Sequence, residues 1–240
     1  MRKALVGVVL SLLAAFVAVA PSGAHAGETV VLLHGLGRSH WSMRPLESRL
    51  EEAGYEVANL GYPSTRLEPD ALVAYVEAAV AQCCAAAPRV HFVTHSLGGI
   101  LVRGYLAKQR PNNLGRVVML APPNRGSELV DELGGWPLFS WILGPTAAQL
   151  GTSADSFPNR LPPADFDLGV IAGTESVNPL GSALLPDGND GTVSVASTRV
   201  EGMRDFIELA ASHTFIMWSD AAAVQVLAFL RNGRFDTVSQ

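Results

Sequence analysis

Hydrophobic positions along the chain form short runs that alternate between the patterns of buried strands and of helices. Strands are predicted at Thr29–Leu33, Tyr55–Leu60, Arg89–Thr94, Arg116–Leu120, Phe166–Ala172 and Asp205–Leu209. The first run, TVVLL, is aliphatic without polar alternation, which is typical of a strand buried on both faces. Helices are predicted at Trp41–Ala53, Pro69–Ala86, Leu97–Gln109 and Ala221–Asn232. This order indicates an α/β fold, with a mostly parallel sheet of about six strands flanked by helices.

One stretch interrupts the alternation. Between Asn124 and Phe166 no strand pattern occurs, and the apolar residues there are Trp136, Leu138, Phe139, Trp141, Ile142 and Leu143. Loops this long are uncommon in compact domains and often form lids or binding loops. We interpret residues 125–165 as a small apolar cap or lid-like insertion. An ordinary helix packed on the core is the alternative, and whether the segment moves is left open.

The N-terminus has the pattern of a targeting segment. Arg2 and Lys3 precede an uncharged run, Ala4–Ala20, and Ala24-His25-Ala26 offers a cleavage site. We therefore expect a signal peptide over residues 1–26, a mature domain over 27–240, and a secreted or periplasmic protein. An uncleaved membrane anchor is the alternative, because the run is at the short edge of the length that spans a bilayer.

Composition and motifs exclude several classes of function. Lys and Arg total 17 against 22 for Asp and Glu, a net charge of -5, and no basic run indicates a nucleic-acid partner. No H-E-x-x-H motif or Cys/His cluster suggests a metal, and no G-x-G-x-x-G follows a predicted strand. We expect no metal and no cofactor.

The two cysteines, Cys83 and Cys84, are neighbours in the chain. Their Cα atoms should lie about 3.8 Å apart, which is closer than the usual disulfide range. We expect two small buried helix residues that cannot link distant parts of the fold, with a redox pair as the alternative.

The chemistry of the chain centres on Ser96. The sequence Thr94-His95-Ser96-Leu97-Gly98-Gly99 lies between a predicted strand and a predicted helix, and it is nearly the G-x-S-x-G nucleophile elbow. In that context a sharp turn projects the Ser96 hydroxyl from the sheet edge, and Gly98 lets the helix pass close to the strand. A helix N-cap is the other interpretation of Ser96. We interpret the neighbouring His95 as a structural hydrogen-bonding residue.

With this motif in this context, the chain resembles α/β-hydrolases, most of all small bacterial lipases and esterases of the PGAP1-like, lipase class 2 type. Thr94 departs from the pattern, because it occupies the first glycine position of the elbow. The resemblance implies a serine nucleophile followed along the chain by an acid and then a histidine. His213 is the only histidine after Ser96, so it is the expected base.

The acid is expected in the cluster Asp187-Gly188-Asn189-Asp190-Gly191-Thr192-Val193. Similar N-D-G-T-V segments carry the acid in relatives, so Asp190 is our first choice and Asp187 the second. Both could instead be turn residues, because Asp-Gly pairs favour turns. Weaker candidates are Asp167, Glu175 and Asp205.

The resemblance also implies an oxyanion hole, a pair of backbone amides that stabilise negative charge on the substrate. One donor follows the serine, which gives Leu97. The other lies in the loop after the first strand, His34-Gly35-Leu36-Gly37, which gives Leu36. The segment Asn124–Ser127 also follows a strand, and we interpret it as loop architecture, with a substrate contact as the alternative.

These features predict a serine hydrolase that cleaves carboxylic esters, of the lipase or esterase kind, on lipid or acyl substrates. The expected partner is a small-molecule ester or lipid. We expect a monomer, and the interpretation allows transient contact with a lipid surface. An acyltransferase using the same triad and a non-catalytic binding protein of the same fold are the alternatives. The acyl chain length and the alcohol group of the substrate are not specified.

Overall fold

The computed structural model describes residues 25, 27–134, 136 and 143–236. The expected signal peptide, apart from His25, lies outside the described residues. So do four of the apolar cap residues, namely Leu138, Phe139, Trp141 and Ile142. Among the helices that are described, none is both long and apolar enough to cross a membrane.

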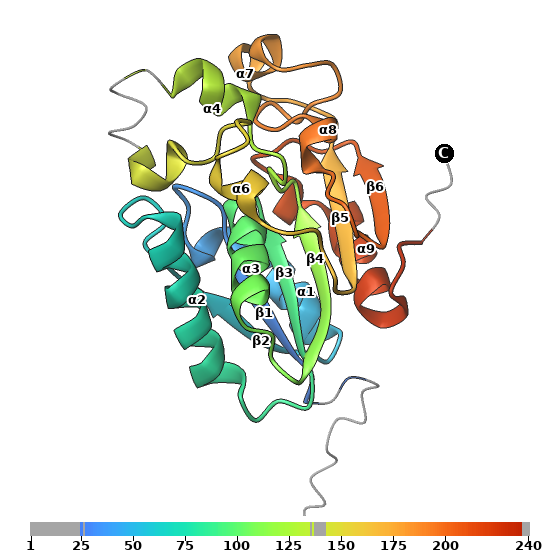
Figure 1. The fold of residues 1–240 in the computed structure, drawn as a ribbon. Coiled ribbons are helices and arrows are strands. Elements are labelled where there is room, and N and C mark those ends of the chain that lie inside the picture. The colour runs from blue at the N-terminus through green and yellow to red at the C-terminus, as the bar shows by residue number, and fades with distance from the viewer. Residues whose placement is uncertain (1–24, 26, 135, 137–142, 237–240) are drawn as a thin grey trace, which may run out of the picture.

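A single sheet of six parallel strands organises the molecule, in the order β2-β1-β3-β4-β5-β6 (Figure 1). The strands are β1 (Thr29–Leu33), β2 (Glu56–Leu60), β3 (Val90–His95), β4 (Leu114–Leu120), β5 (Leu168–Gly173) and β6 (Asp205–Leu209). All six predicted strands are present, with ends shifted by at most two residues. The α/β prediction is confirmed, and the sheet is parallel throughout.

Long helices cover both faces of the sheet. On one face lie α2 (Pro69–Cys84) and α3 (Leu97–Lys108), and on the other lie α1 (Arg44–Glu52) and α9 (Asp220–Asn232) (Figure 1). Successive residues of β1 alternate between the two layers, since Val31 and Leu33 belong to the α2–α3 core and Val30 and Leu32 to the α1–α9 core. Both faces are therefore buried, which explains the unbroken aliphatic run.

The predicted helix over 41–53 is divided in two. A 3-10 turn, η1 (His40–Met43), leads into α1, which has Pro45 in its first turn. Proline has no amide hydrogen for a continuous helix but fits the first turn of a new one, so the α-helix begins there.

Short helices lie in the connections that follow β4, β5 and β6. They are α4 (Glu128–Leu133), α6 (Phe157–Arg160), α7 (Pro179–Leu184), α8 (Val195–Thr198) and η2 (Ile216–Trp218). Figure 1 shows α4 and α7 above the ends of the strands. Within the described part of the segment 125–165 there are helices and no strand, as the sequence indicates.

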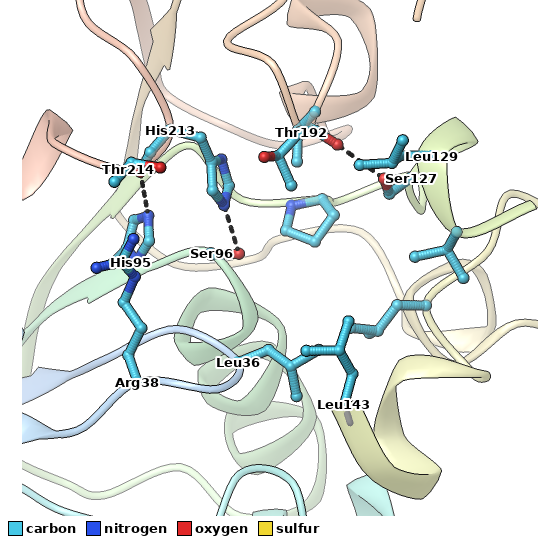
Figure 2. A pocket seen from close by; sticks show the side chains of 14 residues that line it. Leu36, Arg38, His95, Ser96, Ser127, Leu129, Leu143, Thr192, His213 and Thr214 are labelled. Atoms are coloured by element: carbon cyan, nitrogen blue, oxygen red, sulfur yellow. Dashed lines mark hydrogen bonds between the residues drawn. The ribbon is translucent and has the colours of Figure 1, made fainter. Parts of the chain in front are cut away.

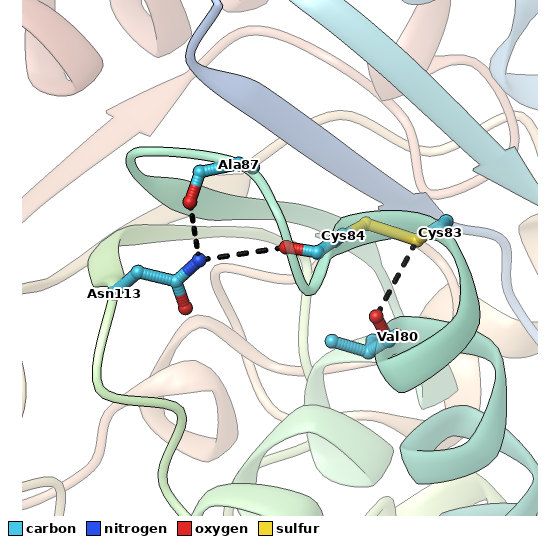
Figure 3. The surroundings of a disulfide bond; sticks show 5 residues. All are labelled: Val80, Cys83, Cys84, Ala87 and Asn113. Carbon is cyan, nitrogen blue, oxygen red and sulfur yellow. Dashed lines mark hydrogen bonds between the residues drawn. A yellow bond between two sulfur atoms is a disulfide. The ribbon is translucent and has the colours of Figure 1, made fainter.

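The cysteine prediction is wrong. Cys83 and Cys84 form a disulfide at the end of α2, with their Cα atoms 3.7 Å apart (Figure 3). The peptide between neighbours fixes this separation, so the usual Cα range, which describes cysteines apart in sequence, does not decide the pairing. Only Cys84 is buried, and Asn113 donates hydrogen bonds to the carbonyl groups of Cys84 and Ala87. The disulfide links no distant segments, as expected.

Gly98 provides a test of how tightly α3 packs on the sheet. A Cβ atom there would lie 2.6 Å from the Leu33 carbonyl oxygen and 2.9 Å from that of His34. We predict that Gly98→Ala lowers the free energy of unfolding by roughly 1–3 kcal/mol, the cost typical of overpacking. Urea denaturation measures it.

Whether Gly98→Ala lowers or raises the free energy of unfolding shows whether α3 is tightly packed at this position. At an open helix position, Gly→Ala stabilises by roughly 0.5–1 kcal/mol. The exposed Ala107 of the same helix allows a control, because Ala107→Gly reports helix propensity without a clash. A higher urea midpoint for Gly98→Ala would show that α3 has room at this point.

Candidate active site

Ser96 forms the turn between β3 and α3. Its backbone has φ 52° and ψ −122°, a conformation that L-residues rarely adopt. Thr94, at the departure from the motif, is an ordinary buried strand residue paired with Leu33 and Met119. Its branched side chain is therefore accommodated within β3, and the sharp turn begins after it.

His213 and Asp190 meet Ser96 from two other loops. Asp190 lies in the loop between α7 and α8, and His213 follows β6. The Nε2 atom of His213 is 3.1 Å from the Ser96 Oγ atom, and its Nδ1 atom is 2.7 Å from the Asp190 Oδ2 atom. All three residues are at most 9% exposed. The structure thus brings together the three residues expected from the sequence.

The hydrogen bonds of Asp190 orient the histidine ring. Its Oδ1 atom accepts the amides of Thr192 at 3.0 Å and Val193 at 2.7 Å, which holds the carboxylate in place. With Oδ2 accepting the Nδ1 hydrogen of His213, the Nε2 atom is left to accept the Ser96 hydroxyl.

The other acid candidates lie elsewhere. Asp187 and Glu175 are exposed, and neither carboxylate is hydrogen-bonded or ion-paired with His213. Asp167 forms ion pairs with arginines, and Asp205 accepts the Phe235 amide. Of the five acids considered, Asp190 is the one next to the histidine.

His95 supports His213 from behind, as expected of a structural hydrogen-bonding residue. Its Nε2 atom donates to the carbonyl oxygen of His213 at 3.0 Å. Burial holds the pKa of His95 well below its usual value, and the nearby His213 and Arg38 lower it further. His95 therefore stays neutral and keeps the hydrogen bond that fixes the backbone at His213.

The loop after β1 passes directly over Ser96. A Cβ atom on Gly35 would lie 2.7 Å from the His95 Nδ1 atom and 3.2 Å from the Ser96 Cβ atom, so only glycine fits. The loop carries Leu36, which lines the pocket, and the amide of Leu97 is the first of α3. The first amides of a helix have no acceptor within it.

Residues after β2 hold this loop, and the sequence analysis missed them. The Tyr62 hydroxyl donates to the carbonyl oxygen of His34, and their rings stack 4.1 Å apart. The Gly37 amide donates to the Ser64 hydroxyl at 3.1 Å. The pairing of the strands could have indicated these residues, because β1 and β2 are parallel neighbours and their carboxyl ends lie at the same edge of the sheet.

The pocket at Ser96 has two chemically different sides (Figure 2). Arg38, His95 and Thr214 form a polar side next to His213. The opposite side is apolar, and several of its residues come from the segment 125–165: Leu129, Val130, Leu143 and Leu150. Part of the expected cap thus lines the pocket.

The segment Asn124–Ser127 mainly connects and stabilises neighbouring parts of the fold. The buried Arg103 guanidinium donates to the carbonyl and side-chain oxygens of Asn124 at 3.0 and 3.2 Å, and the side-chain Nδ2 of Asn124 donates to the Thr198 carbonyl. Burial lowers the pKa of Arg103 to about 10. Ser127 does line the pocket, with its hydroxyl donating to the Thr192 carbonyl. The role of Arg103 was missed, because in sequence it is one basic residue of a helix.

Within residues 25, 27–134, 136 and 143–236, no three His, Cys, Asp or Glu side chains gather in a group that could hold a metal ion.

Comparison with known proteins agrees with this architecture. The profile of the alpha/beta hydrolase family matches residues 30–234, so the chain belongs to that family. No curated protein matches the chain.

Several solved structures share the fold. The mature lipase BlEst2 of Bacillus licheniformis is similar at 21% identity, over 87% of this chain and 92% of that one, with a TM-score of 0.66. The metagenomic carboxyl esterase MGS0156 is 21% identical over 80% of this chain and 66% of its own, with a TM-score of 0.64. Phospholipase PlaB of Legionella pneumophila is 20% identical over 78% and 53%, with a TM-score of 0.57.

Proposed function

We propose that this protein is a serine hydrolase that cleaves carboxylic esters of lipid or acyl type. The observation that carries the proposal is the hydrogen-bonded chain from Ser96 through His213 to Asp190, in which Ser96 and His213 line a pocket with an apolar side. Solved structures of the same fold include proteins titled lipase and carboxyl esterase, which supports the same chemistry.

The reaction begins with Ser96. His213 takes the hydroxyl proton through Nε2, and the Ser96 oxygen attacks the acyl carbonyl of the ester. Asp190 holds the ring with Nδ1 protonated and stabilises the imidazolium that forms. His213 then gives the proton to the leaving alcohol, and an acyl-enzyme remains. Water activated by His213 attacks the acyl-enzyme and releases the carboxylic acid.

The amides of Leu36 and Leu97 are the proposed oxyanion hole. Leu36 lines the same pocket as Ser96, and the amide of Leu97 starts α3, where the helix dipole favours negative charge. Preorganised donors of this kind typically contribute roughly 100- to 1,000-fold each in rate. The contacts of Tyr62 and Ser64 with the loop keep the Leu36 amide in position.

The apolar side of the pocket is the proposed acyl site. Leu129, Val130, Leu143 and Leu150 offer a hydrocarbon surface beside the reacting serine. Burying an acyl chain there stabilises binding by about 0.8 kcal/mol for each methylene group removed from water. Residues 125–165 thus act as the cap of the acyl site.

Secretion or export to the periplasm belongs to the same proposal. The N-terminal pattern of Arg2, Lys3 and the uncharged run supports a cleaved signal peptide. The disulfide between Cys83 and Cys84 is of a kind found mostly in oxidising compartments.

Loss of the nucleophile tests the reaction. We predict that the mature protein, residues 27–240, hydrolyses p-nitrophenyl esters, and that Ser96→Ala lowers kcat by at least about 1,000-fold. Initial rates from acetyl to palmitoyl esters give the chain-length preference. A folded Ser96→Ala variant as active as the parent would refute the mechanism, and an inactive parent would favour a non-catalytic binding protein.

The two neighbouring acids provide a matched pair. Asp190→Asn should lower kcat by roughly 100- to 10,000-fold, because an amide cannot hold the histidine tautomer. Asp187→Asn makes the same chemical change three positions earlier, at an exposed site, and should leave kcat within about twofold. Equal losses in the two variants would remove Asp190 from the mechanism.

Export is tested by the mass of the protein recovered from cells. The full chain, expressed in a bacterial host, should appear outside the cytoplasm with Gly27 as its first residue. Intact-mass spectrometry of each fraction measures this. A membrane-bound product that retains Met1 to Ala26 would instead support an uncleaved anchor.

A further inference from the structure

Arg38 is a cation in the pocket without an anionic partner. Its side chain is partly buried, and burial lowers the pKa of the guanidinium, although arginine stays protonated at neutral pH. In the described part of the chain no carboxylate pairs with the guanidinium, and the guanidinium donates no hydrogen bond. A charge partly removed from water without a partner disfavours the folded state.

Two other arginines show how this fold otherwise treats the same group. The more deeply buried Arg103 donates to backbone carbonyls and to the side chain of Asn124. On the surface, Arg204 pairs with Asp167 at 2.7 Å. Arg38 differs from both, because its guanidinium is partly buried without a partner and lies at the pocket, where a bound molecule can reach it.

The position of Arg38 in the pocket places it beside the alcohol portion of the proposed ester substrate. Figure 2 shows its side chain extending toward His95, on the side of Ser96 where Thr214 lies, and away from Leu129 and Leu143. In the proposed reaction the Nε2 atom of His213 must reach the leaving oxygen, so the alcohol lies on the side of His213. The acyl chain then occupies the apolar side.

We infer that the natural substrates are esters whose alcohol portion carries an anionic group, a phosphate or a carboxylate, which Arg38 binds. The inference rests on the proposed function and narrows its substrate class. The planar guanidinium matches both anions with two parallel hydrogen bonds. Thr214 adds a hydroxyl on the same side.

A different role for Arg38 would have a different signature. If the guanidinium stabilised the oxyanion of the tetrahedral intermediate, its removal would slow neutral and anionic esters equally. A role in binding the alcohol group slows the anionic ester selectively, so the informative quantity is the ratio of kcat/KM between matched esters.

Two pairs of butyryl esters measure this ratio. The phosphate pair is the butyryl ester of glycerol phosphate against that of glycerol, and the carboxylate pair is the butyryl ester of hydroxybutanoate against that of hydroxybutanamide. The variants are Arg38→Gln and Arg38→Lys. Arg234→Gln is the control, because it removes the same charge from an exposed site near Asp205, at the start of β6.

We expect Arg38→Gln to lower the ratio of kcat/KM between the anionic and the neutral ester by about 10- to 100-fold in at least one pair. One charge-assisted hydrogen bond contributes a preference of about this size. Arg38→Lys should retain part of the preference, and Arg234→Gln all of it. The pair that responds identifies the anion. Unchanged ratios, or equal losses on both members of each pair, would overturn the inference. Should the glutamine variant fail to fold, Arg38→Met takes its place.

A binding measurement separates this inference from the proposed reaction. If the parent protein hydrolyses none of the esters, the proposed function fails. Calorimetry with Ser96→Ala protein then still compares the anionic and the neutral ester of both pairs. Tighter binding of either anionic ester that disappears when Arg38→Gln is added would support the anion site, and equal binding within both pairs would refute it.

Discussion

The turn at Ser96 is the constraint on which the rest of the site depends. One residue, at φ 52°, reverses the chain from β3 into α3, a conformation that costs roughly 1–3 kcal/mol and persists only where the surroundings enforce it. Close packing holds the turn in this conformation from both α3 and the loop after β1. Gly98 leaves no space between α3 and the Leu33 carbonyl, and Gly35 leaves none between the β1 loop and His95. The carboxyl ends of parallel strands then bring Asp190 and His213 to the same edge.

Local patterns sufficed to predict this framework. Strand bounds followed from aliphatic runs, and the position of Ser96 followed from a motif whose spacing reflects the turn itself. The order of serine, acid and histidine that the resemblance to α/β-hydrolases implies singled out His213, the only histidine after Ser96. The choice between Asp190 and Asp187 was different in kind, because both lie in Asp-Gly turns. Only the folded chain shows that one carboxylate is buried against the histidine while the other is exposed.

The features that escaped prediction all depend on contacts between distant segments. Tyr62 holds the His34 carbonyl, and Arg103 holds Asn124, yet neither residue belongs to a motif. The disulfide of Cys83 and Cys84 depends on side-chain direction at a helix end, which sequence spacing does not encode. The pocket shows the same limit. Its apolar side could be anticipated from the long insertion, whereas the unpaired charge of Arg38 beside His95 is apparent only once the loops are assembled.

The central claim is that the assembled site makes Ser96 a nucleophile, and the most direct measurement is its covalent capture. A fluorophosphonate reagent should add once to the folded mature protein, and peptide mapping should place the adduct on Ser96, because the reagent takes the position of the acyl group. Labelling should fall to the level of the unfolded chain in a folded His213→Gln variant, since the serine then lacks its base. An unlabelled native protein, or an adduct at another serine, would contradict the account.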